Sequence, residues 1–199
     1  MTETTSPYRN FKEKICTFAK GQHGIRNPFV IAAVEPEIEH RIASRLTDWA
    51  TDGTEAPQIP TDVTIQPIWL DELLPRTDVY KLLVDLREVT DPSQIEGTMQ
   101  DRLSEELVEV MIDEEIEDAH LETQRHVVLL LHLGSLYPFS RASELLDELD
   151  RRNVKSTIGI PFPGSLVNQN LNFFETGESS RYYPAHQIDG KIREVHLQQ

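Results

Sequence analysis

The sequence feature that most constrains the fold is a continuous apolar run, Val127-Val-Leu-Leu-Leu131, in which polar and apolar residues do not alternate. A strand of this kind is buried on both faces, as in a parallel sheet that helices cover on each side. The run is also far too short to span a bilayer. A second run of the same character, Pro28-Phe-Val-Ile-Ala-Ala-Val34, lies near the N-terminus. Together the two runs predict a covered parallel sheet, with 126–133 as a central strand.

The segments around these runs have the periodicities of further helices and strands. Pro67 makes the strand at 63–70 an edge or bulged strand, and Pro75 breaks the helical pattern of 71–89. Asp189-Gly190 separates two strand-like runs, 182–188 and 191–197, which predicts a C-terminal β-hairpin. The expected helices are 8–20, one that begins at Pro36, 71–89, 99–118 and 140–152, and the expected strands are 28–34, 63–70, 126–133 and 155–161.

Alternation of strands with helices predicts an α/β fold: one domain over 8–199, with a mostly parallel, Rossmann-like sheet flanked by helices. Residues 1–7 are expected to form a disordered tail. In such sheets, ligand sites lie beyond the carboxyl ends of the strands. The segments at those ends are 35–37, Asp71, 134–138 and 161–164.

The charge of the chain limits its partners and its setting. Asp and Glu number 34 against 19 Lys and Arg, a formal net charge of −15, and only 6 of the 19 are lysines. This balance argues against sequence-specific DNA binding, which depends on basic surfaces. An acidic excess with few lysines favours a halophilic source, because strong hydration keeps such a surface soluble in salt. The single cysteine, Cys16, fits a reducing cytoplasm, and no secretory or membrane segment is expected.

The sequence motifs that would indicate phosphate binding or catalysis are incomplete. The turn from Gly134 to Arg141 lies between a strand and a helix, where a phosphate-binding loop would be, but it has neither a second glycine nor a following Lys-Ser/Thr. Gly134-Ser135 and Gly164-Ser165 do not form the Gly-x-Ser-x-Gly pattern of a nucleophile elbow. We therefore expect no catalytic residues, no metal and no cofactor. A nuclease or hydrolase remains an alternative, since Glu35, Glu37 and Asp71 stand at strand ends.

Several motifs of the C-terminal part resemble those of the BrxB family of bacteriophage-exclusion (BREX) defence systems. The stretch from Val127 to Pro138 is similar to the family's strand and its Gly-Ser-Leu-Trp/Tyr-Pro turn. The segments Ile158–Gly164, Leu171–Phe174 and Tyr182–Ala185 follow in the family's order, and Gly24–Ile31 and Ile68–Leu73 agree more loosely. Two positions depart from the pattern: Pro184 stands in place of an arginine, and Phe162 in place of a tyrosine.

The resemblance implies a small cytoplasmic subunit that is not an enzyme and has a P-loop-like fold with a degenerate phosphate loop. Its partners would be an alkaline-phosphatase-like protein of the PglZ type, an ATPase and a DNA methyltransferase. The leading hypothesis is thus an adaptor or scaffold that binds the PglZ-type subunit, and the runner-up is a nucleotide-binding regulator that uses the Gly134–Arg141 turn. The candidate residues for binding a partner or ligand are Gly134, Ser135, Tyr137, Pro163, Gly164, Tyr182 and Tyr183.

Overall fold

A computed structural model describes residues 6–21, 27–53, 55–86, 96–137, 140, 142–167, 170–174, 179–180 and 185–198. The helices are α1 (Pro7–Ala19), α2 (Glu39–Asp52), α3 (Leu70–Leu73), α4 (Asp78–Leu86), α5 (Glu96–Val110), α6 (Asp118–Leu121) and α7 (Ala142–Arg151). The strands are β1 (Phe29–Val34), β2 (Thr64–Trp69), β3 (His126–Leu131), β4 (Thr157–Val167), β5 (Asn170–Phe173), β6 (Ser179–Ser180) and β7 (His186–Gln187). Short turns of 3-10 helix are η1 (Pro36–Ile38), η2 (Leu74–Arg76), η5 (Leu133–Leu136) and η6 (Glu194–Leu197), and η4 (Met111–Glu115) is a π-helical turn.

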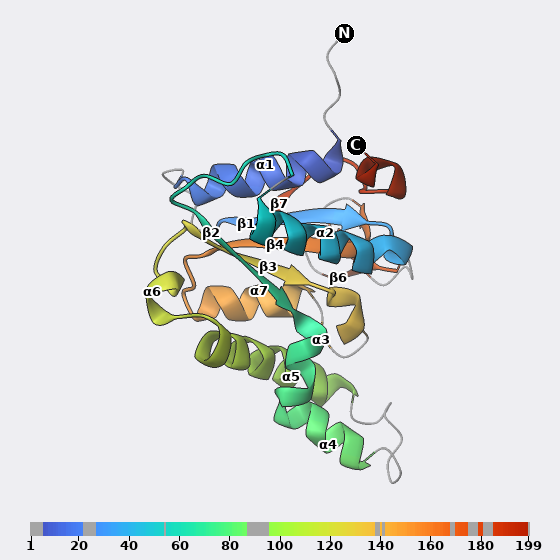
Figure 1. Ribbon diagram of the computed structural model, residues 1–199. Helices are drawn as coiled ribbons and strands as arrows, with labels where there is room; N and C mark the ends of the chain where they lie inside the picture. The colour runs from blue at the N-terminus through green and yellow to red at the C-terminus, as the bar shows by residue number, and fades with distance from the viewer. Residues whose placement is uncertain are drawn as a thin grey trace.

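Five strands form a parallel sheet in the order β2-β3-β4-β1-β7 (Figure 1). This confirms the predicted α/β class. Pro67 is in β2, which lies at the edge of the sheet, as its missing N–H requires. β3 is an interior strand between β2 and β4, and all six of its residues are buried.

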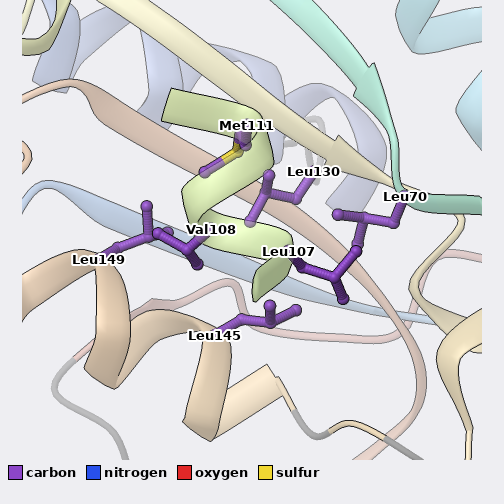
Figure 2. A pocket seen from close by; sticks show the side chains of 7 residues that line it. All are labelled: Leu70, Leu107, Val108, Met111, Leu130, Leu145 and Leu149. Carbon is purple, nitrogen blue, oxygen red and sulfur yellow. The ribbon is translucent and has the colours of Figure 1, made fainter. Parts of the chain in front are cut away.

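Helices cover both faces of the sheet, and each face has its own core. Alternate residues of β3 divide between them: Val127, Leu129 and Leu131 pack with α1 and α2, whereas Val128 and Leu130 pack with α3, α5 and α7. This arrangement accounts for the absence of polar positions in β3. Figure 2 shows seven apolar side chains that meet between α5, α7, α3 and β3, and the gap among them is too small for a water molecule. That space is therefore packed core and not a ligand pocket.

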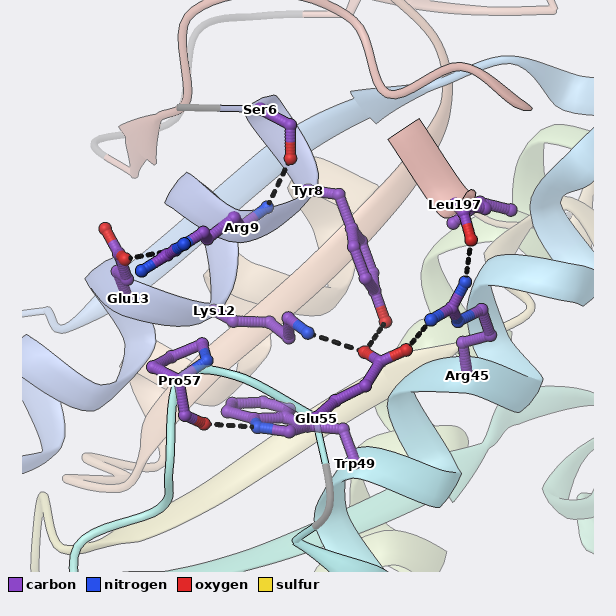
Figure 3. Close-up of polar contacts among 10 residues, drawn as sticks. All are labelled: Ser6, Tyr8, Arg9, Lys12, Glu13, Arg45, Trp49, Glu55, Pro57 and Leu197. Carbon is purple, nitrogen blue, oxygen red and sulfur yellow. Dashed lines mark hydrogen bonds and ion pairs between the residues drawn. The ribbon is translucent and has the colours of Figure 1, made fainter. Parts of the chain in front are cut away.

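On the face of the sheet that α1 and α2 cover, a buried ion pair also links these two helices (Figure 3). Lys12 of α1 is 2 % exposed, and its Nζ lies 2.6 Å from Oε2 of Glu55, which also accepts a hydrogen bond from the hydroxyl of Tyr8 at 3.1 Å. Arg45 of α2 pairs with the same carboxylate and donates to the carbonyl of Leu197. The Glu55 carboxylate thus joins α1, α2 and the C-terminal turn.

Two expectations about the C-terminal part were wrong. The predicted hairpin about Asp189-Gly190 does not form, because His186–Gln187 and Ile192 both lie beside β1 and run parallel to it. Residues 194–197 then form η6 and not a strand. The strand expected to end at Pro161 continues to Val167, where its last four residues pair antiparallel with β5. Local turn chemistry predicted a hairpin, but both segments pair with β1 instead of with each other.

Other boundaries agree only in part with the sequence patterns. The helical pattern expected over 71–89 is interrupted at Pro75, where α3 gives way to η2. The helix expected over 99–118 ends as α5 at Val110, and the π-helical turn η4 follows. The tail expected over 1–7 extends too far, because the Ser6 hydroxyl accepts a hydrogen bond from the Arg9 N–H and Pro7 begins α1, while residues 1–5 lie outside the described residues. In the part of the chain that the structure describes, no helix is both long and apolar enough to cross a membrane.

Candidate functional site

Polar and aromatic side chains gather where β1, β2 and β3 end. Glu39 and His40 begin α2 after β1, Trp69 and Asp71 stand at the end of β2 and in α3, and His132 follows β3 directly. The carboxyl ends of parallel strands meet at one edge of the sheet, so these residues converge from distant parts of the sequence. We call Glu39, His40, Trp69, Asp71 and His132 the strand-end cluster.

Glu39 links two of the loops at this edge. Its Oε1 accepts a hydrogen bond of 2.8 Å from the backbone N–H of Gly134, and its side chain is buried, with the residue only 5 % exposed. Burial raises the pKa of Glu39, while the Gly134 N–H and the nearby His132 oppose that rise. Glycine at position 134 leaves room for this carboxylate, because a Cβ would stand 2.3 Å from Oε2 of Glu39 and displace it.

The hydrogen bond between Glu39 and Gly134 joins two loops that lead to opposite faces of the sheet. The connection after β1 leads to α2, on one face of the sheet, and the connection after β3 leads to α7, on the other face, with β4 between the two strands. Such a switch point is where open α/β sheets form ligand sites, because the diverging loops leave a crevice between them. The strand-end cluster therefore lies at the sheet edge where ligand sites of open α/β folds are commonly found.

His132 is held in an unusual conformation. Its φ is 59°, in the left-handed region that residues other than glycine rarely adopt. Strain of this kind persists only where the surroundings enforce it, and it is concentrated at functional sites. His132 Nδ1 lies 3.1 Å from Asp71 Oδ2, and the His132 ring is surrounded by the rings of His40 and Trp69, with centroids 5.6 and 6.0 Å away.

The contact between His132 and Asp71 is incomplete as a hydrogen bond. Despite the short distance, His132 Nδ1 has no hydrogen-bond partner of acceptable geometry, and the same is true of Asp71 Oδ1. Both atoms are buried from solvent although their side chains are 26 % and 39 % exposed. Buried polar atoms are normally paired, so these two atoms make the contact between His132 and Asp71 an unusual feature of the cluster.

Three backbone N–H groups in the turn after β3 donate hydrogen bonds within the protein. The N–H of Gly134 is bonded to Glu39, that of Ser135 to the carbonyl of His132, and that of Tyr137 to the carbonyl of Gly134. The Ser135 hydroxyl donates to the same His132 carbonyl at 2.7 Å. A phosphate-binding loop must instead present such N–H groups to its ligand. These three N–H groups are thus engaged within the protein.

The other predicted binding residues lie beside this turn. Tyr137 packs against Phe173 and Phe174, with ring centroids 5.5 and 5.2 Å away. Pro163 and Gly164 are buried in β4, where the Pro163 carbonyl accepts a hydrogen bond from Phe174 N–H at 3.2 Å. A Cβ on Gly164 would lie 2.0 Å from the Asn172 carbonyl oxygen. Pro163 and Gly164 thus shape the strand, while Tyr182 and Tyr183 lie outside the described residues.

The structure brings only one of the three predicted acidic residues to this site. Asp71 belongs to the strand-end cluster, whereas Glu35 faces Arg193 with a separation of 3.7 Å and the exposed Glu37 lies in η1. Sequence reasoning missed Glu39 and His132, although both follow apolar strand runs within a few residues. Among the described residues, no three His, Cys, Asp or Glu side chains are placed to hold a metal ion. What the cluster offers chemically is carboxylate acceptors, imidazole rings and an indole face.

Comparison with known proteins identifies the family. The family model of the BREX protein BrxB matches residues 62–188, more than half of the chain, including β2 to β4 and the turn at Gly134. A search of curated proteins gave no match, and a search of solved structures gave none either.

Proposed function

Because the chain belongs to the BrxB family of BREX proteins, we propose that it works in the cytoplasm as a non-catalytic adaptor that binds the PglZ-type, alkaline-phosphatase-like subunit. Family membership makes the chain a component of BREX anti-phage defence. The adaptor role is our inference from the chemistry of the strand-end cluster and its neighbouring turn.

The observation that carries this proposal is the hydrogen bond between Glu39 and Gly134. A buried carboxylate accepts the N–H of Gly134, in the turn where an enzyme of this fold would hold a phosphate. A phosphate brought within about 4 Å of that carboxylate would meet a repulsion of about 4 kcal/mol per unit charge. This contact disfavours a nucleotide at the turn, which supports the recognition of a protein over the turnover of a phosphate ester.

The runner-up, a nucleotide-binding regulator, makes the opposite prediction. Calorimetry with ATP or GTP and Mg²⁺ should show no binding to the purified chain. A micromolar signal that Ser135→Trp abolishes would favour the regulator and contradict the adaptor, since the substitution fills the turn without changing its charge.

Co-purification tests the adaptor directly. The chain, carrying an affinity tag, is purified at native salt from a host that expresses the complete operon, and the PglZ-type subunit is expected to elute with it. Operons that lack either the PglZ-type gene or the ATPase gene identify the direct partner: only the first deletion should leave the chain without its main companion. A chain that elutes alone from the complete system contradicts the proposal.

A further inference from the structure

The five-stranded parallel sheet ends in two outer strands, β2 and β7, whose outer edges differ. Among the described residues, no strand pairs with either outer edge. Thr64 of β2 donates its N–H to the Arg125 carbonyl, so its backbone faces β3, and Pro67, three positions on, faces outward. A proline in that place presents no N–H, which keeps further strands from pairing there. The segment His186–Ile188 has no proline, so the edge of β7 lacks this protection.

Gln187 presents its backbone to the outer edge of β7. The register places Ile31 of β1 opposite Gln187, and the N–H of the next residue, Ile188, donates to the Ile31 carbonyl at 2.9 Å. In a parallel pair, successive residues of a strand direct their N–H and C=O to opposite sides, so those of Gln187 point away from β1. Within the described part of the chain, neither group has a hydrogen-bond partner. One donor and one acceptor are thus available to the backbone of another chain.

A groove lies beside this edge, between α1 and β7 (Figure 1). Its volume is about 340 Å³, and it is lined by four residues of α1 between Asn10 and Thr17 and by the segment His186–Asp189. The Phe18 ring of α1 meets the His186 ring edge-on, with centroids 5.7 Å apart, and so joins the helix to the strand. A helix beside an open strand edge suits an extended peptide, because the edge pairs with the backbone while the groove takes side chains.

Lys14 gives the groove its charge preference. Its side chain is partly buried, and its Nζ lies 5.6 Å from the centroid of the Phe18 ring. Of the described residues, no carboxylate forms an ion pair with Lys14: Glu13, which also lines the groove, lies 2.8 Å from Arg9, and Asp189 is exposed. A partly desolvated ammonium gains from a carboxylate that replaces its lost hydration. The groove therefore favours a segment that carries an acidic side chain.

We propose that the edge of β7 and its groove bind an extended segment of the partner protein, which adds a strand through the N–H and C=O of Gln187 and places an acidic side chain against Lys14. A second copy of this chain would set one hollow against another and leave the groove unfilled, whereas an inserted segment fills it. This inference rests on the proposed adaptor function for the identity of the partner.

Fluorescence anisotropy with labelled peptides tests this edge without any partner. The probes are heptapeptides of alternating valine and threonine with glutamate, glutamine or lysine at the centre. The glutamate peptide should bind about two- to fivefold more tightly than the glutamine peptide, as one exposed ion pair provides, and Lys14→Gln should remove this preference. Lys81→Gln, on α4 at the opposite face of the sheet, should keep it. No saturable binding up to about 1 mM peptide, or an unchanged preference in Lys14→Gln, overturns the proposal.

Gln187→Pro tests the backbone hydrogen bonds. Because the Gln187 N–H faces away from β1, proline removes the outward donor and keeps the pairing with β1, as an edge strand allows. Binding of the glutamate peptide should weaken about fivefold or more. Gln187→Ala keeps the N–H and should bind like the wild type, and urea unfolding checks that both variants fold. Equal binding by Gln187→Pro and Gln187→Ala overturns the proposal.

N-methylated peptides test the same hydrogen bonds on the unaltered protein. Successive N–H groups of a strand point to opposite edges, so only every second N–H of the bound peptide faces β7. Methylation of one alternate set of peptide nitrogens should abolish binding, and methylation of the other set should leave it unchanged. An equal effect of the two sets overturns the proposal.

Co-purification separates this inference from the adaptor function. If the wild-type chain and Gln187→Pro capture the PglZ-type subunit equally well, the adaptor function stands and the strand-addition proposal is wrong. If the wild-type chain captures nothing, the adaptor function is wrong, and the peptide titrations decide whether the edge binds an extended segment. Capture by the wild type and by Gln187→Ala but not by Gln187→Pro supports both.

Discussion

Replacing Gly134 with alanine tests the hydrogen bond between the Gly134 N–H and the Glu39 carboxylate. The φ angle of Gly134 lies outside the left-handed region, so alanine can adopt this backbone without strain. Its methyl group, however, would stand 2.3 Å from Oε2 of Glu39 and 3.1 Å from the Phe174 ring. Because the first distance is far below van der Waals contact, the carboxylate must move and lose the Gly134 N–H.

The expected loss of stability follows from two opposing effects. A hydrogen bond to a charged group contributes about 1.5–3 kcal/mol. Gly→Ala at a compatible backbone position returns about 0.4–1 kcal/mol by restricting the unfolded chain. Gly134→Ala should therefore lower the free energy of unfolding by about 0.5–2.5 kcal/mol. For a chain of this length, each kcal/mol lowers Tm by about 2–4 °C.

A double-mutant cycle by urea unfolding tests the cause. In the Glu39→Ala background the carboxylate is gone, and only the Phe174 contact, which needs a shift of a few tenths of an ångström, opposes the new methyl group. Gly134→Ala should then leave the free energy of unfolding unchanged or raise it by up to about 1 kcal/mol, because the restriction of the unfolded chain remains. Equal losses in both backgrounds would refute the reasoning, since they would place the strain elsewhere than at Glu39.

Three further predictions concern stability. Burial and the neighbouring His120 lower the pKa of His126 from 6.5 to about 4, so the folded protein should lose up to about 3 kcal/mol as pH falls through that interval. His126→Gln should flatten this part of the curve measured by urea unfolding, and an unchanged slope contradicts it. Glu55→Gln leaves the buried Lys12 cation unpaired and should lower the free energy of unfolding by about 3 kcal/mol. Adding Lys12→Met should recover most of that loss. A double variant as unstable as Glu55→Gln argues against a buried charge as the cause. If the acidic excess is an adaptation to a salt-rich cytoplasm, the thermal midpoint should rise from dilute buffer to concentrated KCl, and equal stability in both contradicts it.

The fold could be predicted from the sequence where burial alone decides the pattern. The apolar runs at β1 and β3 carry no polar positions because helices cover both faces, and Pro67 predicted an edge or bulged strand at β2, which is an edge strand. The C-terminal part could not be predicted in this way. Asp189-Gly190 has the local chemistry of a hairpin turn, but β1 had a free edge that both flanking segments pair with in parallel. Local sequence propensity carries no information on whether the two segments pair with each other or with the distant strand β1.

For a similar reason, only some residues of the candidate site could be predicted from the sequence. The position of the strand ends follows from the order of elements, which is why Asp71 and Gly134 could be named. Glu39 lies within a helical, acidic stretch whose pattern is that of a solvated first turn, and nothing in it signals a buried side chain. Its burial depends on Gly134, some 95 positions away, which has no Cβ to exclude the carboxylate. His132 carried no signal because a left-handed backbone at histidine is set by its neighbours.

The hydrogen bond between Glu39 and Gly134 changes both the donors and the charge at this edge of the sheet. A turn after a parallel strand presents backbone N–H groups and ordinarily attracts anions. Here the anion is supplied by the chain itself: Glu39 accepts the Gly134 N–H and adds its negative charge to that of Asp71 nearby. This edge of the sheet therefore carries carboxylates beside the turn, where a phosphate-binding loop would present free N–H donors. Such an arrangement disfavours a phosphate, which fits the incomplete motifs and the proposed recognition of a protein partner.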